Sequence, residues 1–278
     1  MEVARKLGYQ PFAPARLLRR GKSNIVLVVS RESVIYPGIS LVIEQLATAL
    51  AKIDFSLVWQ FGYSTDDEHL AANLAPAAVV ALVDETDIPT LASLQRFMAP
   101  IITLANHDWA NAGPRAQVEY LLGQAQRPIV YAATEKLPLE HINRQRCEIV
   151  RQTCREHGLP EPRIVTISEE REKARQAVAD LIAVQPLPFA ICAYNDEVAL
   201  AGLAALYDLG IAVPEQVSVI GHDDIPMAQL SVPPLTTIGI EASDLLERLI
   251  ASVVSVCQGG PVLEPPPLKA RVVVRGSA

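Results

Sequence analysis

The chain is poor in the features that define several protein classes. Its 278 residues include four cysteines and no C-x-x-C pair, which predicts neither a disulfide framework nor a zinc site. No run of about 18 apolar residues is present, and the first thirty residues hold no apolar signal core, so we expect neither membrane spanning nor secretion. Half of the residues are hydrophobic and a fifth are charged, which excludes global disorder. We expect a cytoplasmic protein with buried thiols.

Motifs of the common catalytic folds are also missing. There is no G-x-G-x-x-G after a strand, no G-x-x-x-x-G-K-[ST], no G-x-S-x-G and no H-E-x-x-H. The five histidines lack metal-ligand spacing, and we expect them at the surface or at helix ends. We therefore predict no catalytic residue, no metal and no cofactor. An enzyme with two α/β lobes is an alternative that requires a base or nucleophile facing the crevice.

Charge is divided unevenly along the chain. Residues 1–23 hold six basic residues against Glu2, a charge of +5, so the other 255 residues carry −12 within the total of −7. A basic segment before an acidic body favours contact of that segment with phosphate groups. A frayed basic end without a partner is the alternative.

Short apolar runs alternate with amphipathic segments along the rest of the chain. Residues 24–30 have the β-branched composition of a buried parallel strand, and residues 39–51 repeat apolar side chains at helical spacing. This alternation predicts parallel sheets covered by helices on both faces. The further expected strands are 55–61, 77–83, 101–104, 129–133, 163–167, 189–193, 217–221 and 270–275, and the further helices are 66–74, 138–157, 169–184, 197–209 and 241–256. About nine such units exceed one small sheet, so we predict two lobes with a ligand between their strand ends.

Polar pairs follow two of the expected strands. Asn195 and Asp196 come after strand 189–193, and Asp223 and Asp224 come after strand 217–221. An amide both donates and accepts hydrogen bonds and a carboxylate accepts from hydroxyls, so together the pairs favour a pocket for a polar ligand. The alternatives are a helix cap for the first pair and a turn for the second.

A segment of some fifty residues around these pairs carries a family resemblance. The matching pieces are Asn195-Asp196 with Ala199 and Gly202, Gly210 with Val213-Pro214, residues 217–224, residues 233–238 and the ending 271–277. This segment closely resembles the effector-binding core of the lactose-repressor (LacI/GalR) family of bacterial transcriptional regulators. The resemblance implies a periplasmic-binding-protein-like (type I) α/β fold, with two lobes that each hold a parallel β-sheet flanked by helices.

The same resemblance implies a domain organisation. We expect the end of a DNA-binding headpiece and a hinge in residues 1–23. The N-terminal lobe would comprise residues 24–133 plus 238–260, and the C-terminal lobe residues 134–237 plus 261–278.

The N-terminal segment also resembles the family. Residues 7–11 are similar to the end of the headpiece, and residues 15–23 to the hinge helix. On this match Ala15, Arg16 and Leu18 contact DNA, with Leu18 as a minor-groove wedge and Arg16 as a groove or phosphate contact. An unstructured linker is the alternative. The family's major-groove reading helix would have to precede Met1, so we do not expect this chain as written to read operator bases.

For the second lobe, the resemblance assigns the effector contacts to three residues. Asn195 and Asp223 would hydrogen-bond ligand hydroxyls, and Arg146 would bind another oxygen or a carboxylate. Because Arg144 and Arg151 share the helix of Arg146, a solvated basic face is the alternative there.

For the first lobe, the resemblance points to Ser30, Tyr36 and Asn106. Tyr36 would either stack on a sugar ring or simply pack. Asn106 stands where the family often carries an aspartate, and residues 109–114 are too short for a strand usually found there. These departures predict an unusual effector or none.

The resulting hypothesis is a cytoplasmic, homodimeric, DNA-binding transcriptional regulator, a repressor of the LacI family. A small polar effector, a sugar or sugar derivative, would bind between the lobes, and lobe closure would control the binding of operator DNA. Helix 39–51 is a candidate dimer face, with an ordinary core-facing helix as the alternative. A solute-binding protein of a sugar transport system is the rival function.

Overall fold

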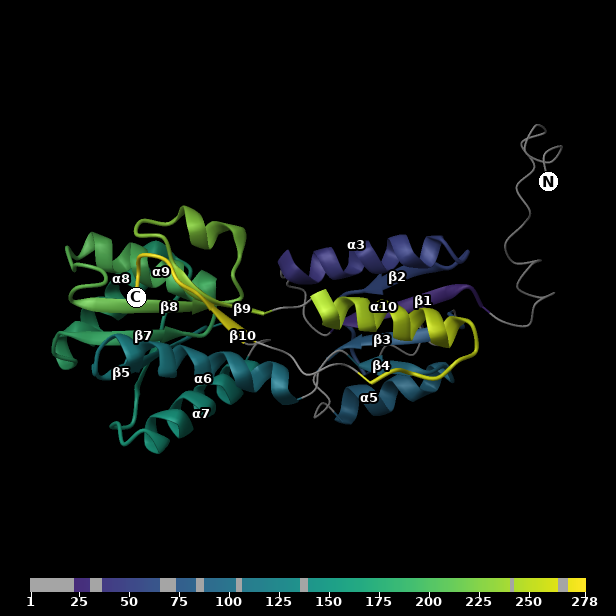
Figure 1. Cartoon of the computed structure of the whole chain (residues 1–278), viewed down its shortest axis with the longest axis horizontal. Coiled ribbons are helices and arrows are strands. Elements are labelled where there is room, and N and C mark those ends of the chain that lie inside the picture. Colours follow the sequence, from purple (N-terminus) through teal and green to yellow (C-terminus); the bar gives the residue numbers. More distant parts are fainter. Residues whose placement is uncertain are drawn as a thin grey trace. The chain divides into compact units, whose positions relative to one another are not determined.

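The computed structural model describes residues 23–30, 37–65, 74–83, 88–103, 107–135, 140–240, 243–264 and 270–278. They fall into two compact units (Figure 1). Unit 1 comprises Met1–Asn106 with Leu246–Pro265, and unit 2 comprises His107–Leu245 with Pro266–Ala278. Several predicted features lie outside the described residues, namely the hinge contacts Ala15, Arg16 and Leu18, the effector candidates Tyr36 and Asn106, and residues 66–73 of the helix expected over 66–74.

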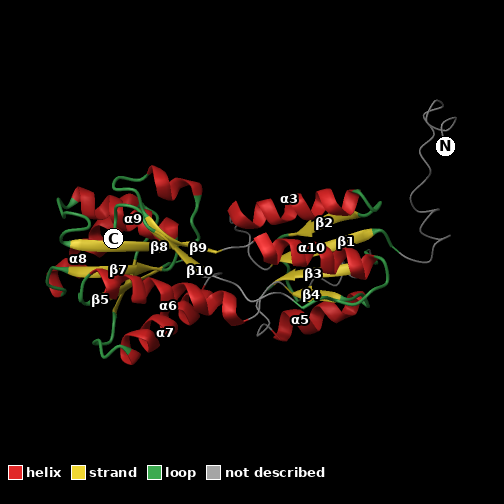
Figure 2. Cartoon of the chain, viewed as in Figure 1, coloured by secondary structure: helices red, strands yellow, loops and turns green. Residues whose placement is uncertain are grey.

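Unit 1 contains a four-stranded sheet in which every pairing is parallel. In the order β2-β1-β3-β4, its strands are Ser56–Gln60, Ile25–Ser30, Ala78–Leu82 and Ile101–Thr103. The helical elements of the unit are α3 (Pro37–Ala51), α5 (Ile88–Leu94), the 3-10 turn η1 (Gln95–Phe97) and α10 (Ser243–Cys257). Figure 2 shows helices on both sides of this sheet.

The alternation of side chains along β1 divides the core of unit 1 into two layers. Val26 and Val28 pack with side chains of α3 and α10, whereas Leu27 and Val29 pack with Leu94 and neighbouring residues of α5 and η1. Both faces of the strand are therefore buried, as its continuous apolar sequence predicts. The core contains one face of α3, which supports the core-facing alternative for this helix.

Unit 2 contains a six-stranded sheet that is parallel except at one edge. In the order β10-β9-β8-β7-β5-β6, its strands are Ala270–Val273, Thr236–Ile240, Val217–His222, Phe189–Ala193, Ile129–Ala133 and Arg163–Thr166. Only the pairing of β10 with β9 is antiparallel. The described part of the sheet is thus mainly parallel, as predicted, and the chain doubles back beside β9 to add one antiparallel edge strand.

Helices cover both faces of the second sheet. They are α6 (His107–Gln124), α7 (Glu140–Glu156), α8 (Arg171–Val184) and α9 (Asp196–Asp208), with the 3-10 helix η3 (Pro226–Leu230) after β8. Helix α6 packs against α7, and α8 packs against α9. The central strands β5, β7 and β8 are buried along their whole length, which requires cover on both sides. No helix in the described part of the chain is both long and apolar enough to cross a membrane.

The structure divides the chain at positions that differ from the predicted lobe boundaries. The sequence places residues 107–133 in the first lobe and residues 238–245 with them, whereas both segments belong to unit 2. Strand β5 pairs with β6 and β7, and β9 pairs with β8, so hydrogen bonding fixes their membership. An apolar strand sequence indicates burial but does not indicate the sheet that the strand joins.

Candidate functional site

The polar residues after β7 and β8 lie at the carboxyl edge of the second sheet. Asn195 is the N-cap of α9, with an extended backbone, and its side-chain Oδ1 accepts a hydrogen bond of 2.9 Å from the Val198 N–H. Its Nδ2 lies 3.4 Å from a Glu197 carboxylate oxygen. The capping alternative is therefore correct for Asn195, and the Glu197 contact uses one of the two N–H groups of its amide.

Asp196 has a structural role. Its side chain is fully buried, and its two oxygens accept hydrogen bonds from the Thr237 hydroxyl and, at 2.9 Å, from the Ile225 N–H. The carboxyl group thus ties the start of α9 to β9 and to the loop after β8. Burial raises the pKa of Asp196 to about 7, because desolvation outweighs the stabilising effect of these two hydrogen bonds.

Asp223 presents a carboxylate in an uncommon backbone conformation. Its φ is 106° and that of Asp224 is 51°, both in the region that non-glycine residues rarely adopt. The Oδ1 atom of Asp223 lies 2.6 Å from Nδ1 of His222 and 3.4 Å from Nη2 of Arg146. The side chain is 25% exposed, and the described residues provide no contact to its Oδ2 atom. The turn alternative holds for the backbone, while the side chain remains accessible at one oxygen.

Arg146 is buried beneath this carboxylate. The residue is 6% exposed, so the alternative of a solvated basic face is wrong for Arg146. Its Nη1 donates a 2.6 Å hydrogen bond to the Tyr194 carbonyl, and its guanidinium carbon lies 4.9 Å from the centre of the Tyr194 ring, a cation–π contact. These contacts hold the cation of α7 against the end of β7.

The electrostatic balance keeps Asp223 ionised. Burial alone would raise the pKa of Asp223, but the charge of Arg146 and the hydrogen bond from His222 outweigh burial and lower it. We call Arg146, Asn195 and Asp223 the effector triad, after the role that the sequence resemblance predicts for them. The structure brings all three to the carboxyl edge formed by adjacent strands. Together they offer a fixed cation, an amide and a carboxylate, which suit a ligand rich in hydroxyl groups.

His222 departs from its predicted placement. The sequence prediction puts the histidines at the surface or at helix ends, but His222 ends β8 and is fully buried. Burial, together with the nearby Arg146 charge, lowers the pKa of His222 and keeps the imidazole neutral. A histidine at the end of a strand gives little indication of this burial. His157, by contrast, is an exposed residue directly after α7, as expected.

Two further polar residues support the edge and were not identified from the sequence. Gln117 of α6 is buried, and its Nε2 donates hydrogen bonds of 2.9 Å to the carbonyls of Ala193 and Gly221 at the ends of β7 and β8. Arg275 donates a 2.6 Å hydrogen bond to Asp224, so that carboxylate is engaged in holding the terminal strand. A lone Gln in a helix carries no sequence signal for such a role.

In unit 1, Ser30 ends β1, as predicted. It is 7% exposed, and its hydroxyl accepts a 3.3 Å hydrogen bond from the Trp59 indole N–H. Its carbonyl accepts a 2.9 Å bond from the Tyr63 N–H. These contacts give Ser30 a structural environment, and its effector contact stays a prediction.

Three of the four thiols are buried. Cys147, Cys154 and Cys192 are buried, and Cys257 is partly exposed; none is in a disulfide. Burial raises the pKa of Cys154 and of Cys257 to about 11, so both are protonated near neutral pH. The described residues contain no cluster of three or more His, Cys, Asp or Glu side chains that could hold a metal ion.

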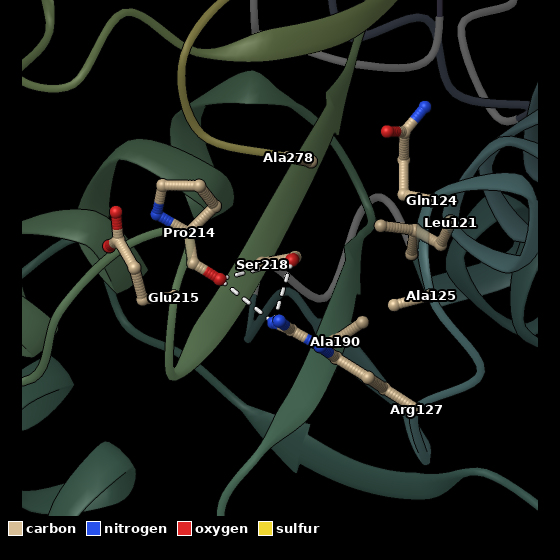
Figure 3. A pocket seen from close by; sticks show the side chains of 9 residues that line it. All are labelled: Leu121, Gln124, Ala125, Arg127, Ala190, Pro214, Glu215, Ser218 and Ala278. Atoms are coloured by element: carbon tan, nitrogen blue, oxygen red, sulfur yellow. Dashed lines mark hydrogen bonds between the residues drawn. The ribbon is translucent and has the colours of Figure 1, made fainter.

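A cavity of about 280 Å³ lies at the opposite, amino edge of the second sheet (Figure 3). Arg127 points into it and donates hydrogen bonds of 2.8 Å to the Pro214 carbonyl and 3.1 Å to the Ser218 hydroxyl. The remaining lining is formed by Leu121, Gln124, Ala125, Ala190, Glu215 and Ala278. The cation of Arg127 is engaged by the protein itself, and none of the polar residues predicted to bind an effector lines this cavity.

Comparison with known proteins places this geometry in context. Residues 118–278 match the model of the periplasmic binding protein-like domain. The chain is 26% identical over 269 residues to the ribose operon repressor of Escherichia coli K12, with 88% of this chain and 79% of that protein covered. It is 36% identical over 88 residues to the HTH-type transcriptional regulator AscG of the same strain, covering 32% of this chain and 26% of that protein.

Among solved structures, the chain resembles a LacI family transcriptional regulator from Silicibacter pomeroyi. The TM-score is 0.75 at 20% sequence identity, and the match covers 91% of this chain and 98% of that one. This likeness confirms the two-sheet α/β fold class predicted from the sequence.

Proposed function

Because the chain belongs to the family of periplasmic binding protein-like domains, we propose that it is the effector-binding part of a LacI-family transcriptional repressor. Its effector is a small polar metabolite, a sugar or sugar derivative. The names of the ribose operon repressor and of AscG, both regulators of transcription, support this proposal. We place its action in the cytoplasm, and we assign it binding rather than catalysis.

One observation carries the proposal, namely the contact of Arg146 with Asp223 beside Asn195. Asp223 Oδ1 is engaged by Arg146 and His222, whereas Oδ2 has no partner among the described residues. A ligand hydroxyl can donate to Oδ2, and other ligand oxygens can accept from the guanidinium or from the Asn195 amide. A polyhydroxylated compound offers both kinds of group on neighbouring carbons.

Control of DNA binding is the wider part of the proposal. Effector binding would change lobe closure and thereby the grip of a homodimer on operator DNA through Ala15, Arg16 and Leu18. The ribose operon repressor match, which covers 79% of that protein, supports this reading.

The rival function, a solute-binding protein of a sugar transport system, fits the same family description. It predicts sugar binding without any effect on DNA. The named relatives favour the regulator.

A thermal-shift screen tests the proposed site. The panel consists of D-ribose, D-glucose and cellobiose, their available phosphate esters, and free nucleosides. A compound that binds only the folded state stabilises it by about 2.7 kcal/mol at a hundred times its Kd. We expect at least one panel compound to raise Tm in this way.

Two variants locate the binding. Asp223→Asn replaces the accepting carboxylate, and Asn195→Asp keeps the cap acceptor for Val198 but removes the amide donors. Each should abolish the ligand-dependent rise in Tm without unfolding the protein. Asp208→Asn, which alters only an exposed ion pair with Arg171, is the matched control. If both site variants respond like the control, the triad is not the effector site.

A further inference from the structure

His222 connects the carboxylate of Asp223 to helix α6. Its imidazole is fully buried, and its Nδ1 lies 2.6 Å from Asp223 Oδ1. The other ring nitrogen, Nε2, is buried and has no hydrogen-bond partner in the described part of the chain. The ring therefore makes one polar contact, and that contact is with a member of the effector triad.

Gly113 of α6 provides the space that the imidazole occupies. A Cβ atom at position 113 would overlap Nε2 and would lie 2.6 Å from Cδ2 of His222. No real Cβ contact is this close, so the ring packs directly against the backbone of α6. Gln117, one turn further along, fixes α6 to the ends of β7 and β8 through its hydrogen bonds to Ala193 and Gly221. Helix α6 therefore packs directly against the imidazole and is itself hydrogen-bonded to the ends of β7 and β8.

The chemistry of the pair sets the protonation state of the ring. An ionised carboxylate only accepts hydrogen bonds, so Nδ1 must carry the proton that Asp223 Oδ1 receives. Because the ring is neutral, Nε2 then has a lone pair and no donor to meet it. A buried acceptor without a partner weakens folding rather than strengthening it, so stability does not explain an imidazole at this position.

We propose that His222, held in place by Gly113, is a positioning residue that orients the Asp223 carboxylate for the effector. The Nδ1–H group fixes Oδ1, and this directs Oδ2 to the accessible side of the sheet edge. The Asp223 N–H is fixed by a 2.8 Å hydrogen bond to the Ile238 carbonyl of β9. Among the described residues, the closest side-chain contact of its carboxylate is the one from His222 at 2.6 Å, against 3.4 Å from Arg146. The proposal rests on the proposed function in that Asp223 is taken to bind the effector.

The first test uses the wild-type protein without any ligand. Nitrogen-15 NMR of the histidine side chains should show one imidazole, assigned to His222 through a His222→Asn variant, that stays neutral at pH 6. That ring should carry its proton on Nδ1. A His222 ring protonated on Nε2, or one that titrates like a solvent-exposed histidine, would overturn the proposal.

Variants then separate positioning from packing. In His222→Asn the amide nitrogen takes the place of Nδ1, whereas His222→Leu fills similar space without a donor. Carbon-13 NMR of the Asp223 carboxyl should show its titration midpoint shifted upward in His222→Leu and restored in His222→Asn. A purely structural role would leave this midpoint unchanged in both variants and would overturn the proposal.

Two glycine variants of α6 test the packing of Gly113 against the imidazole. Gly113→Ala should displace the ring and shift the Asp223 midpoint upward, as His222→Leu does. Gly123→Ala, whose Cβ meets nothing within 4 Å, should leave it unchanged. His157→Leu controls for the loss of a histidine at an exposed position. An equal shift in Gly113→Ala and Gly123→Ala would contradict the role of Gly113.

The effector arm uses the panel sugar that raises the wild-type Tm most. We expect His222→Leu to bind it roughly tenfold more weakly, an effect typical of one lost hydrogen bond, and His222→Asn to recover most of the affinity. If the Asp223 midpoint shifts as expected but the affinity does not change, the His222 contact stands and the proposed effector site fails. If no panel sugar binds, the proposed function fails, while the NMR arms still decide the role of His222.

Discussion

At the residue scale, the contacts of each carboxylate at the sheet edge distinguish those with a structural role from the one that can contact a ligand. Asp196 is buried and accepts two protein hydrogen bonds, and Asp224 is held by Arg275. Asp223 has a lowered pKa and an oxygen without a partner among the described residues. The sequence predicts the pairs 195–196 and 223–224 as polar residues at strand ends. It cannot tell which oxygens the protein itself uses, because this depends on partners such as Thr237 and Arg275, far away in the chain.

Asp196 makes a prediction about pH. Its folded-state pKa of about 7 lies above the value of 3.8 expected for the unfolded chain, so the folded protein holds the proton more tightly. The free energy of unfolding therefore falls as the pH rises from about 4 to about 7, by roughly 3 to 5 kcal/mol from this group. Asp196→Asn cannot ionise; its amide oxygen can accept from the Ile225 N–H while its NH2 group donates to the Thr237 hydroxyl oxygen, so it should flatten this part of the profile.

Urea denaturation at pH 5 and pH 7.5 measures that difference. The stability of Asp196→Asn relative to wild type should be greater at pH 7.5 than at pH 5. Asp180→Asn, an exposed change on α8, should follow the wild-type profile. Parallel profiles for wild type and Asp196→Asn would show that Asp196 is ionised throughout the range.

Gly221 makes a prediction about packing beside the same carboxylate. A Cβ atom at this position would overlap Asp196 Oδ1 and would lie 2.9 Å from Leu235 Cδ2. Gly221→Ala should therefore destabilise the protein by about 1–3 kcal/mol, the usual effect of overpacking a core. In the same urea assay, Gly123→Ala should instead stabilise α6 by about 0.5–1 kcal/mol. A neutral Gly221→Ala would mean that the edge can relax around a methyl group.

At the element scale, the sequence predicts strands whose two faces are both buried. The runs that form β1, β7 and β8 are mostly apolar, so their burial follows from composition. Strand β9, Thr-Thr-Ile-Gly-Ile, is not among the predicted strands, although its β-branched residues favour a strand. The sequence predicts its antiparallel partner β10 as a strand, but an apolar pattern does not indicate whether two strands pair in parallel or antiparallel.

The closing residues of unit 2 make a prediction at this scale. Ser277 is fully buried; its hydroxyl accepts a 2.9 Å bond from the Thr236 N–H and donates a 2.6 Å bond to the Val219 carbonyl. Ser277→Ala leaves both backbone groups without this partner and should destabilise the protein by about 1–3 kcal/mol. Ser56→Ala, at an exposed strand start in unit 1, should change the denaturation midpoint little. Equal midpoints for the two variants would contradict a fastening role for Ser277.

At the scale of the whole molecule, fold class was predictable and lobe boundaries were not. Alternating strands and helices in excess of one sheet predict two α/β units, which the structure has. The predicted lobe boundary at residue 133 differs from the observed one at residue 107. The sequence patterns of α6 and β5 predict a helix and a strand but do not indicate which sheet these elements join. The residues predicted to contact DNA and the first-lobe candidates Tyr36 and Asn106 lie outside the described residues, so their roles remain predictions.

A crystal structure of the protein with the most stabilising panel compound would show whether the effector binds at Asp223. We expect a ligand oxygen within about 2.6–3.2 Å of Asp223 Oδ2, with Arg146 or the Asn195 amide contacting another ligand atom. A ligand bound instead in the cavity beside Arg127 and Ser218, with Asp223 left untouched, would contradict it.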